Sequence, residues 1–162
     1  MKRFWKVLAV MLGVVGMVCA FSGCSRDTAG SDKDVPISDI VEKLKSGLEW
    51  EYSMIQATDA MIEGWYSFDS EKVEEFTVYV TDFPSVADEI VVVKLSDKGY
   101  LSEAETILKD RVDNRKKEFE GYSPTEAYKA ENAVITSHGN YVALIVGNDF
   151  DKADSVFEDC FK

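Results

Sequence analysis

Residues 89–96 constrain the fold of this chain more than any other part of its sequence. They read EIVVVKLS and are apolar at nearly every position. A strand with one solvated face alternates apolar and polar residues, so this composition predicts a strand in the middle of a sheet. Residues 76–81 do alternate, with Phe76, Val78 and Val80 on one side, and predict a half-buried strand next to it.

A second pair of strands is predicted around the glycine and asparagine at positions 139–140. Glycine in the first place of a two-residue loop suits a tight hairpin turn, which pairs residues 133–138 with residues 141–146. In that register His138 lies opposite Tyr141, and the apolar side chains of both strands collect on one face. The agreement between turn and pattern supports the hairpin.

The remaining apolar residues follow helical spacing. The expected element order is α-α-β-β-α-β-β-α, which favours an α+β fold: an antiparallel sheet of about four strands in two hairpins, with the helices packed on one face. Residues 49–57 fit neither pattern clearly. The helices are expected at residues 36–48, 58–65, 102–119 and 149–161, with a short helical turn at 125–132.

The first residues have the pattern of an export signal. Three basic residues precede an uncharged apolar stretch at positions 7–21, and polar sequence follows at once. A transmembrane helix needs about 20 apolar residues, so the stretch is short for a membrane span. It matches a secretory signal peptide.

The end of this stretch resembles a bacterial lipobox, with Ser22 and Gly23 before Cys24. In such precursors the cysteine thiol receives a lipid, and a peptidase cuts between the residues that correspond to Gly23 and Cys24. Phe21 departs from the leucine usual at its position, so an ordinary signal peptide or an uncleaved anchor stays open. The lipobox predicts a protein anchored by lipid to the outer face of the cell membrane.

Three parts of the chain follow from these patterns. Residues 1–23 are expected to be the signal peptide. Residues 24–35 are the lipidated cysteine and a flexible tether, which is too polar to bury a core. Residues 36–162 are expected to form a single α+β domain.

The chain is acidic, with 30 acidic and 18 basic residues and a formal charge of −12. Residues 1–23 hold three basic and no acidic residues, so their removal changes the formal charge to −15. A nucleic-acid-binding protein needs a basic face, so we expect no nucleic-acid partner. The expected partners are the membrane, through the lipid on Cys24, and an unidentified protein or cell-envelope ligand.

Several short motifs recur in a familiar order. They are residues 88–94 (DEIVVVK), Arg111, residues 119–124 (FEGYSP) and residues 139–142 (GNYV). Together they resemble the family catalogued as domain of unknown function 4358, which occurs in small lipoproteins of Gram-positive, clostridia-like bacteria. The resemblance spans residues 37–160 and implies a cell-surface lipoprotein, but it supplies no catalytic residue.

One helix concentrates basic residues. Arg111 and Arg115 are four positions apart and therefore lie on one face of the helix at 102–119. The functional interpretation is an anion-binding site for a phosphate or a carboxylate. The alternative is a solvated face or a set of salt bridges within the fold.

Aromatic residues gather before the first strand and could either line a groove or fill the core: Trp50, Tyr52, Trp65, Tyr66 and Phe68. His138 is the single histidine, and Cys160 is the one cysteine after Cys24. Neither belongs to a motif for nucleophilic or metal chemistry, so we expect no catalytic residue, no metal and no cofactor.

Two functions remain open. The favoured one is a non-enzymatic binding or interaction module. The alternative is a hydrolase of cell-envelope glycan that uses two carboxylates, since acidic residues are abundant. A deep cleft with two facing carboxylates would favour the enzyme, and a shallow groove lined by aromatic residues or by Arg111 and Arg115 would favour binding.

Overall fold

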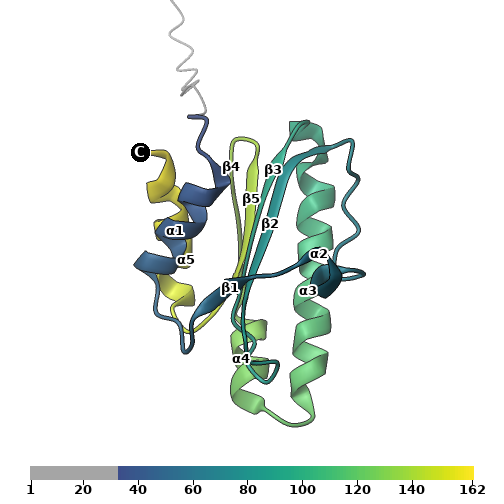
Figure 1. Cartoon of the computed structure of the whole chain (residues 1–162), viewed down its shortest axis with the longest axis vertical. Helices are drawn as coiled ribbons and strands as arrows, with labels where there is room; N and C mark the ends of the chain where they lie inside the picture. Colours follow the sequence, from purple (N-terminus) through teal and green to yellow (C-terminus); the bar gives the residue numbers. More distant parts are fainter. Residues whose placement is uncertain (1–32) are drawn as a thin grey trace, which may run out of the picture.

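Five antiparallel strands form one open sheet in the computed structural model, which describes residues 33–162 (Figure 1). Their order across the sheet is β1-β2-β3-β5-β4. The strands are β1 (Met54–Gln56), β2 (Val73–Thr81), β3 (Glu89–Leu95), β4 (Val134–His138) and β5 (Tyr141–Val146). The α+β class and both predicted hairpins are confirmed, with β1 added at one edge.

β3 lies at the centre of the sheet, as its apolar sequence predicted. It pairs with β2 on one side and with β5 on the other. The hairpin of β4 and β5 has the predicted register, with His138 opposite Tyr141. Gly139 has a φ of 61°, which glycine adopts without the steric cost that a side chain would add.

The helices cover both faces of the sheet, so the prediction that they pack on one face was wrong (Figure 1). The physical reason was visible in the sequence of β3. A strand that is apolar on both of its faces must be covered on both sides of the sheet. On one face lie α1 (Ile37–Gly47) and α5 (Phe150–Glu158) with the short turn η2 (Asp159–Phe161). On the other lies α3 (Leu101–Glu120), preceded by η1 (Lys98–Tyr100) and followed by α4 (Pro124–Glu131).

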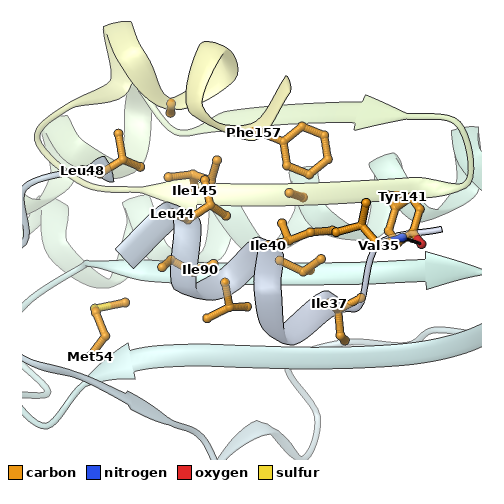
Figure 2. Close-up of a cluster of buried hydrophobic side chains, with 14 residues drawn as sticks. Val35, Ile37, Ile40, Leu44, Leu48, Met54, Ile90, Tyr141, Ile145 and Phe157 are labelled. Atoms are coloured by element: carbon orange, nitrogen blue, oxygen red, sulfur yellow. Dashed lines mark hydrogen bonds between the residues drawn. The ribbon is translucent and has the colours of Figure 1, made fainter. Parts of the chain in front are cut away.

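The core under α1 and α5 is apolar. Ile40 and Leu44 of α1 have no exposed surface and pack against Ile90 and Ile145 of the sheet, and Phe157 of α5 completes the layer (Figure 2). Ile40, Leu44 and Phe157 lie in two of the helices that the spacing of apolar residues predicted. Burial of such a side chain contributes roughly 1.5–3 kcal/mol.

The core under α3 uses the other side chains of the same strands. Val91 and Val93 of β3 meet Ala104, Leu108 and Phe119 of α3, and all five are fully buried. The two cores therefore share one sheet and differ in the helices that close them.

The folded part begins before Pro36. Val35, which we placed in the tether, is 6% exposed and belongs to the core under α1. Its backbone N–H donates to the hydroxyl of Tyr141 at 3.0 Å, and that hydroxyl donates to Asp34 at 2.8 Å. Asp34 also lies 2.9 Å from the ammonium group of Lys94. These contacts fix residues 34 and 35 to the sheet.

The segment between β1 and β2, residues 57–72, is mostly irregular. Its one helix, α2 (Asp59–Ile62), is shorter than the predicted helix at 58–65. We call residues 57–72 the β1–β2 connection. It lies on the α3 side of the sheet, where its aromatic residues pack against the core.

Candidate functional site

A buried ion pair joins the central strand to α3. Glu89 starts β3 with no exposed surface, and Arg111 of α3 is 3% exposed. The guanidinium Nη2 of Arg111 lies 2.9 Å from Oε2 of Glu89, and its Nε lies 3.1 Å from Oε1. Arg111 follows Ala104 and Leu108 at helical spacing, so the helix directs it into the core.

The β1–β2 connection covers this pair. The hydroxyl of Tyr66 donates a hydrogen bond to Oε1 of Glu89. The ring of Trp65 lies on the Arg111 guanidinium, with 4.0 Å between the ring centroid and Cζ. Tyr66 also stacks with Phe68 at 5.7 Å between ring centroids. The β1–β2 connection is therefore held against the domain by its contacts with the ion pair that it covers.

The electrostatics of the pair follow from its burial. Removal from water, together with the negative charge of Glu89, raises the pKa of Tyr66 well above its usual value. Burial opposes the charge of Arg111, but the interactions with Glu89 outweigh it and raise the pKa of Arg111. Tyr66 thus stays a proton donor, and Arg111 stays charged.

Arg115 lies one helical turn after Arg111 and is also engaged within the fold. Its Nη1 lies 2.8 Å from Oε2 of Glu118, and its Nη2 donates to the carbonyl of Val86 at 2.9 Å. Its Nε is buried without a hydrogen bond, 3.6 Å from Oε2 of Glu89. These contacts agree with the alternative that Arg111 and Arg115 form salt bridges within the fold. An external anion would have to displace one of these contacts in order to bind, and the anion-binding site stays a prediction.

A second charged cluster lies beside the first. Lys129 of α4 is 3% exposed, and its Nζ lies 3.0 Å from Asp88, 3.1 Å from Glu126 and 3.1 Å from Glu51. Burial raises the pKa of Asp88 although Lys129 opposes the change. Burial also opposes the charge of Lys129, but its carboxylate partners outweigh it and raise the pKa of Lys129. The cluster fixes α4 to the start of β3.

Openings flank the β1–β2 connection. One of about 400 Å³, which we call the Trp65 groove, lies between the connection, the β2–β3 loop and α3. Another of about 770 Å³, the edge pocket, lies between the connection and β2. The lining of the Trp65 groove includes Met61, Trp65, Phe83, Pro84, Arg115 and Glu118.

The other residues singled out in the sequence lie elsewhere. Nδ1 of His138 is 3.1 Å from Oε2 of Glu158, and its ring stacks on Phe161 at 4.2 Å. Cys160 is a free thiol, and burial raises its pKa, which disfavours the reactive thiolate. Both residues belong to the α5 side of the sheet, away from the buried ion pair.

The aromatic residues at positions 50–68 do not form one cluster. Trp50 packs against the core under α1 and α5, whereas Trp65, Tyr66 and Phe68 pack against the core under α3. Tyr52 contacts Phe83 at the rim of the Trp65 groove, with 4.2 Å between ring centroids. Some of these residues therefore fill the core and others border an opening.

The predicted lipidation and cleavage site, Gly23 and Cys24, lies outside the described residues. Within residues 33–162 no helix has the length and apolar character of a membrane span. The same range contains no group of three or more histidine, cysteine or acidic side chains placed to hold a metal ion.

Glu89, Asp88 and Lys129 were not predicted as members of a buried charged site. One signal was available: a glutamate at the start of an otherwise apolar central strand must be neutralised by a partner when it is buried. The spacing of Arg111 from Ala104 and Leu108 pointed to that partner. Lys129 gave no such signal, because its burial depends on how α4 packs.

Comparison with known proteins places the chain in one family. The model of the family described as domain of unknown function (DUF4358) matches residues 48–147, and the chain belongs to that family. No curated protein and no solved structure matches the chain. The match includes the buried ion pair, the charged cluster around Lys129 and the β1–β2 connection.

Proposed function

We propose that this member of the family is a lipid-anchored binding module on the outer face of the cell membrane. The lipobox pattern around Cys24 supports the anchor, and the short apolar stretch before it supports export. The partner class is a protein or cell-envelope ligand presented at that surface.

The Trp65 groove is the observation that carries the binding function. Met61 and Phe83 expose 39% and 48% of their surface at its walls, and Trp65 lines it. Aromatic side chains give large contact area at low entropic cost and are enriched in recognition sites. A groove lined by aromatic residues in this way favours binding over hydrolysis.

The buried carboxylates support the same choice. A glycosidase needs one carboxylic acid and one carboxylate facing its substrate across a cleft. Here Glu89 is held by Arg111 and Asp88 is held by Lys129, so these two carboxylates hold helices against the sheet. The Trp65 groove is lined by two carboxylates, Asp82 and Glu118, and Glu118 is bound to Arg115.

Site-specific photo-crosslinking in intact cells tests the binding function. A photoreactive residue at Phe83 should give a discrete crosslinked species, while the same residue at exposed Glu42 of α1, on the opposite face, should not. Equal crosslinking from both positions, or none from Phe83, would contradict a binding role for the groove.

The anchor is tested separately. Cys24→Ala should abolish labelling by radioactive palmitate and release the protein from the membrane fraction, because two or more acyl chains supply the stable anchoring. Cys160→Ala is the matched control and should change neither result. A Cys24→Ala protein that still carries label would overturn the lipoprotein assignment.

A further inference from the structure

The outer edge of β2 is only partly paired. β2 runs over nine residues, but β1 pairs with Tyr79, Val80 and Thr81 alone. One more bond, from the N–H of Ala57 to the carbonyl of Val78, ends this ladder at 2.9 Å. The chain then turns into α2 and leaves the edge of the sheet.

The direction of the free backbone groups follows from that last bond. The carbonyl of Val78 points to the β1 side, and in an antiparallel strand both backbone groups of alternate residues point the same way. Phe76 therefore directs its N–H and carbonyl away from β3. Among residues 33–162 no backbone partner lies beyond β1 to receive them.

The edge pocket lies along this unpaired stretch. Val73, Glu74, Glu75 and Phe76 of β2 form one wall, and the β1–β2 connection forms the other. Its apolar floor is aromatic, because Phe76 packs edge-on against Tyr66 at 5.4 Å between ring centroids and Phe68 packs beside them. Five residues, 73–77, span about 17 Å of strand.

The charge of the pocket is one-sided. Its lining has four carboxylates and no basic residue: Asp59, Glu63, Glu74 and Glu75. Glu74 lies 2.7 Å from Lys94. Within residues 33–162 the other three take part in no ion pair, so their negative charge faces whatever occupies the pocket.

We propose that the edge pocket binds an extended basic segment of a partner protein, which adds as a strand to the free edge of β2. Backbone hydrogen bonds to Phe76 set the register. Apolar side chains of the segment pack on the aromatic floor, while lysine or arginine side chains meet Glu63 and Glu75. This inference goes beyond the proposed function, because it uses a different surface from the Trp65 groove.

Selectivity follows from the same residues. β2 has a bulge between Val73 and Glu75, and charged residues flank it. Bulges and charges at an edge prevent indiscriminate pairing of strands. The pocket lining has carboxylates and no basic residue, so it disfavours an acidic strand and favours a basic one as the matching ligand.

Fluorescence anisotropy with the full chain in a nonionic detergent tests this site. The probe is a short, labelled, acetylated peptide that alternates lysine with valine, and its binding should saturate. The double variant Glu63→Lys/Glu75→Lys should weaken it by about tenfold, since two favourable charge pairs become unfavourable. The matched control, Glu42→Lys/Asp151→Lys on the α1 and α5 side, should leave the affinity unchanged.

A second measurement separates strand addition from plain charge attraction. Peptide binding should slow hydrogen exchange of the Phe76 amide by NMR, and methylation of the peptide backbone nitrogens should abolish binding. Binding that survives methylation, exchange protection elsewhere than on β2, or no binding at all would overturn the proposal. Crosslinking from Phe83 reports on the Trp65 groove alone, so failure here is distinguishable from failure of the proposed function.

Discussion

The two faces of the sheet are closed by different chemistry. Under α1 and α5 the buried contacts are apolar, with Ile40 and Leu44 packed on Ile90 and Ile145. Under α3 the apolar core ends at a buried ion pair, and the irregular β1–β2 connection covers it. Both faces therefore exclude water from the central strand, but only the second does so with charges.

The difference indicates which face is available for recognition. An apolar helix layer gains stability from every buried methylene group. An opening of about 310 Å³ on this side lies between the start of α1 and η2, and most of its lining residues are charged. A buried ion pair contributes little net stability, because desolvation of both charges offsets their attraction. The α3 side therefore gains less stability at this position than an apolar contact would give. The β1–β2 connection that covers the ion pair has an opening on each flank, the Trp65 groove and the edge pocket.

The largest expected effect comes from breaking the ion pair on one side. Arg111→Met should lower the free energy of unfolding by about 3–5 kcal/mol, because Glu89 stays buried without its main partner. Urea denaturation followed by circular dichroism measures the loss.

A double variant decides whether that loss reflects the charge. Arg111→Met/Glu89→Leu should recover most of the stability, since position 89 no longer buries a carboxylate without its partner. If the double variant is as unstable as the single one, packing by the arginine side chain and not charge compensation holds this face together.

The apolar face should respond to loss of volume instead. Leu44→Ala removes a fully buried side chain from α1 and should cost about 3 kcal/mol through lost burial and a residual cavity. Leu44→Met, which nearly conserves volume, should cost less than about 1.5 kcal/mol in the same denaturation experiment. Similar losses for the two variants would show that the α1 layer is loosely packed.

A smaller effect isolates the link between the β1–β2 connection and the pair. Tyr66→Phe removes only the hydroxyl that bonds Glu89 and should cost about 2 kcal/mol, the range for a hydrogen bond to a charged group. Tyr79→Phe in β2 is the control, because the Tyr79 hydroxyl makes no hydrogen bond within residues 33–162. An equal loss of stability in both variants would show that the hydrogen bond to Glu89 is not the cause.

The contrast between the faces also explains what the sequence could reveal. A continuous apolar run predicted the central strand, and periodic apolar residues predicted the hairpin and the helices α1 and α3, because burial of a regular element leaves a regular pattern. The composition of β3 held the information that both faces are covered, but we interpreted it only as a central position.

The site was less visible because its parts come from distant positions. Arg111 was noted for its charge, yet its partner Glu89 lies 22 positions away, and Tyr66 lies 23 positions from Glu89. The β1–β2 connection has no periodic pattern, so its course over α3 depends on contacts that form only in the folded chain. The short strand β1 escaped notice for the same reason, since its three residues are too few to alternate clearly.

The smallest expected effect concerns the join between the α1 side and the residues before it. Hydrogen bonds from Lys94 and Tyr141 lower the pKa of Asp34 below its ordinary value. A lowered pKa in the folded state means that folding favours the ionised carboxylate. Its contribution is therefore complete above the ordinary aspartate pKa of about 3.9 and is lost as the pH falls through the lowered value.

Acid should accordingly release residues 34 and 35 as the pH falls through the lowered pKa of Asp34. Exchange of the Val35 amide, which donates to Tyr141, should quicken as the pH falls below about 4, once corrected for the intrinsic pH dependence of exchange. Asp34→Asn should show the faster corrected exchange already at neutral pH and no further step on acidification. A step that persists in Asp34→Asn would assign it to another carboxylate and contradict the role of Asp34.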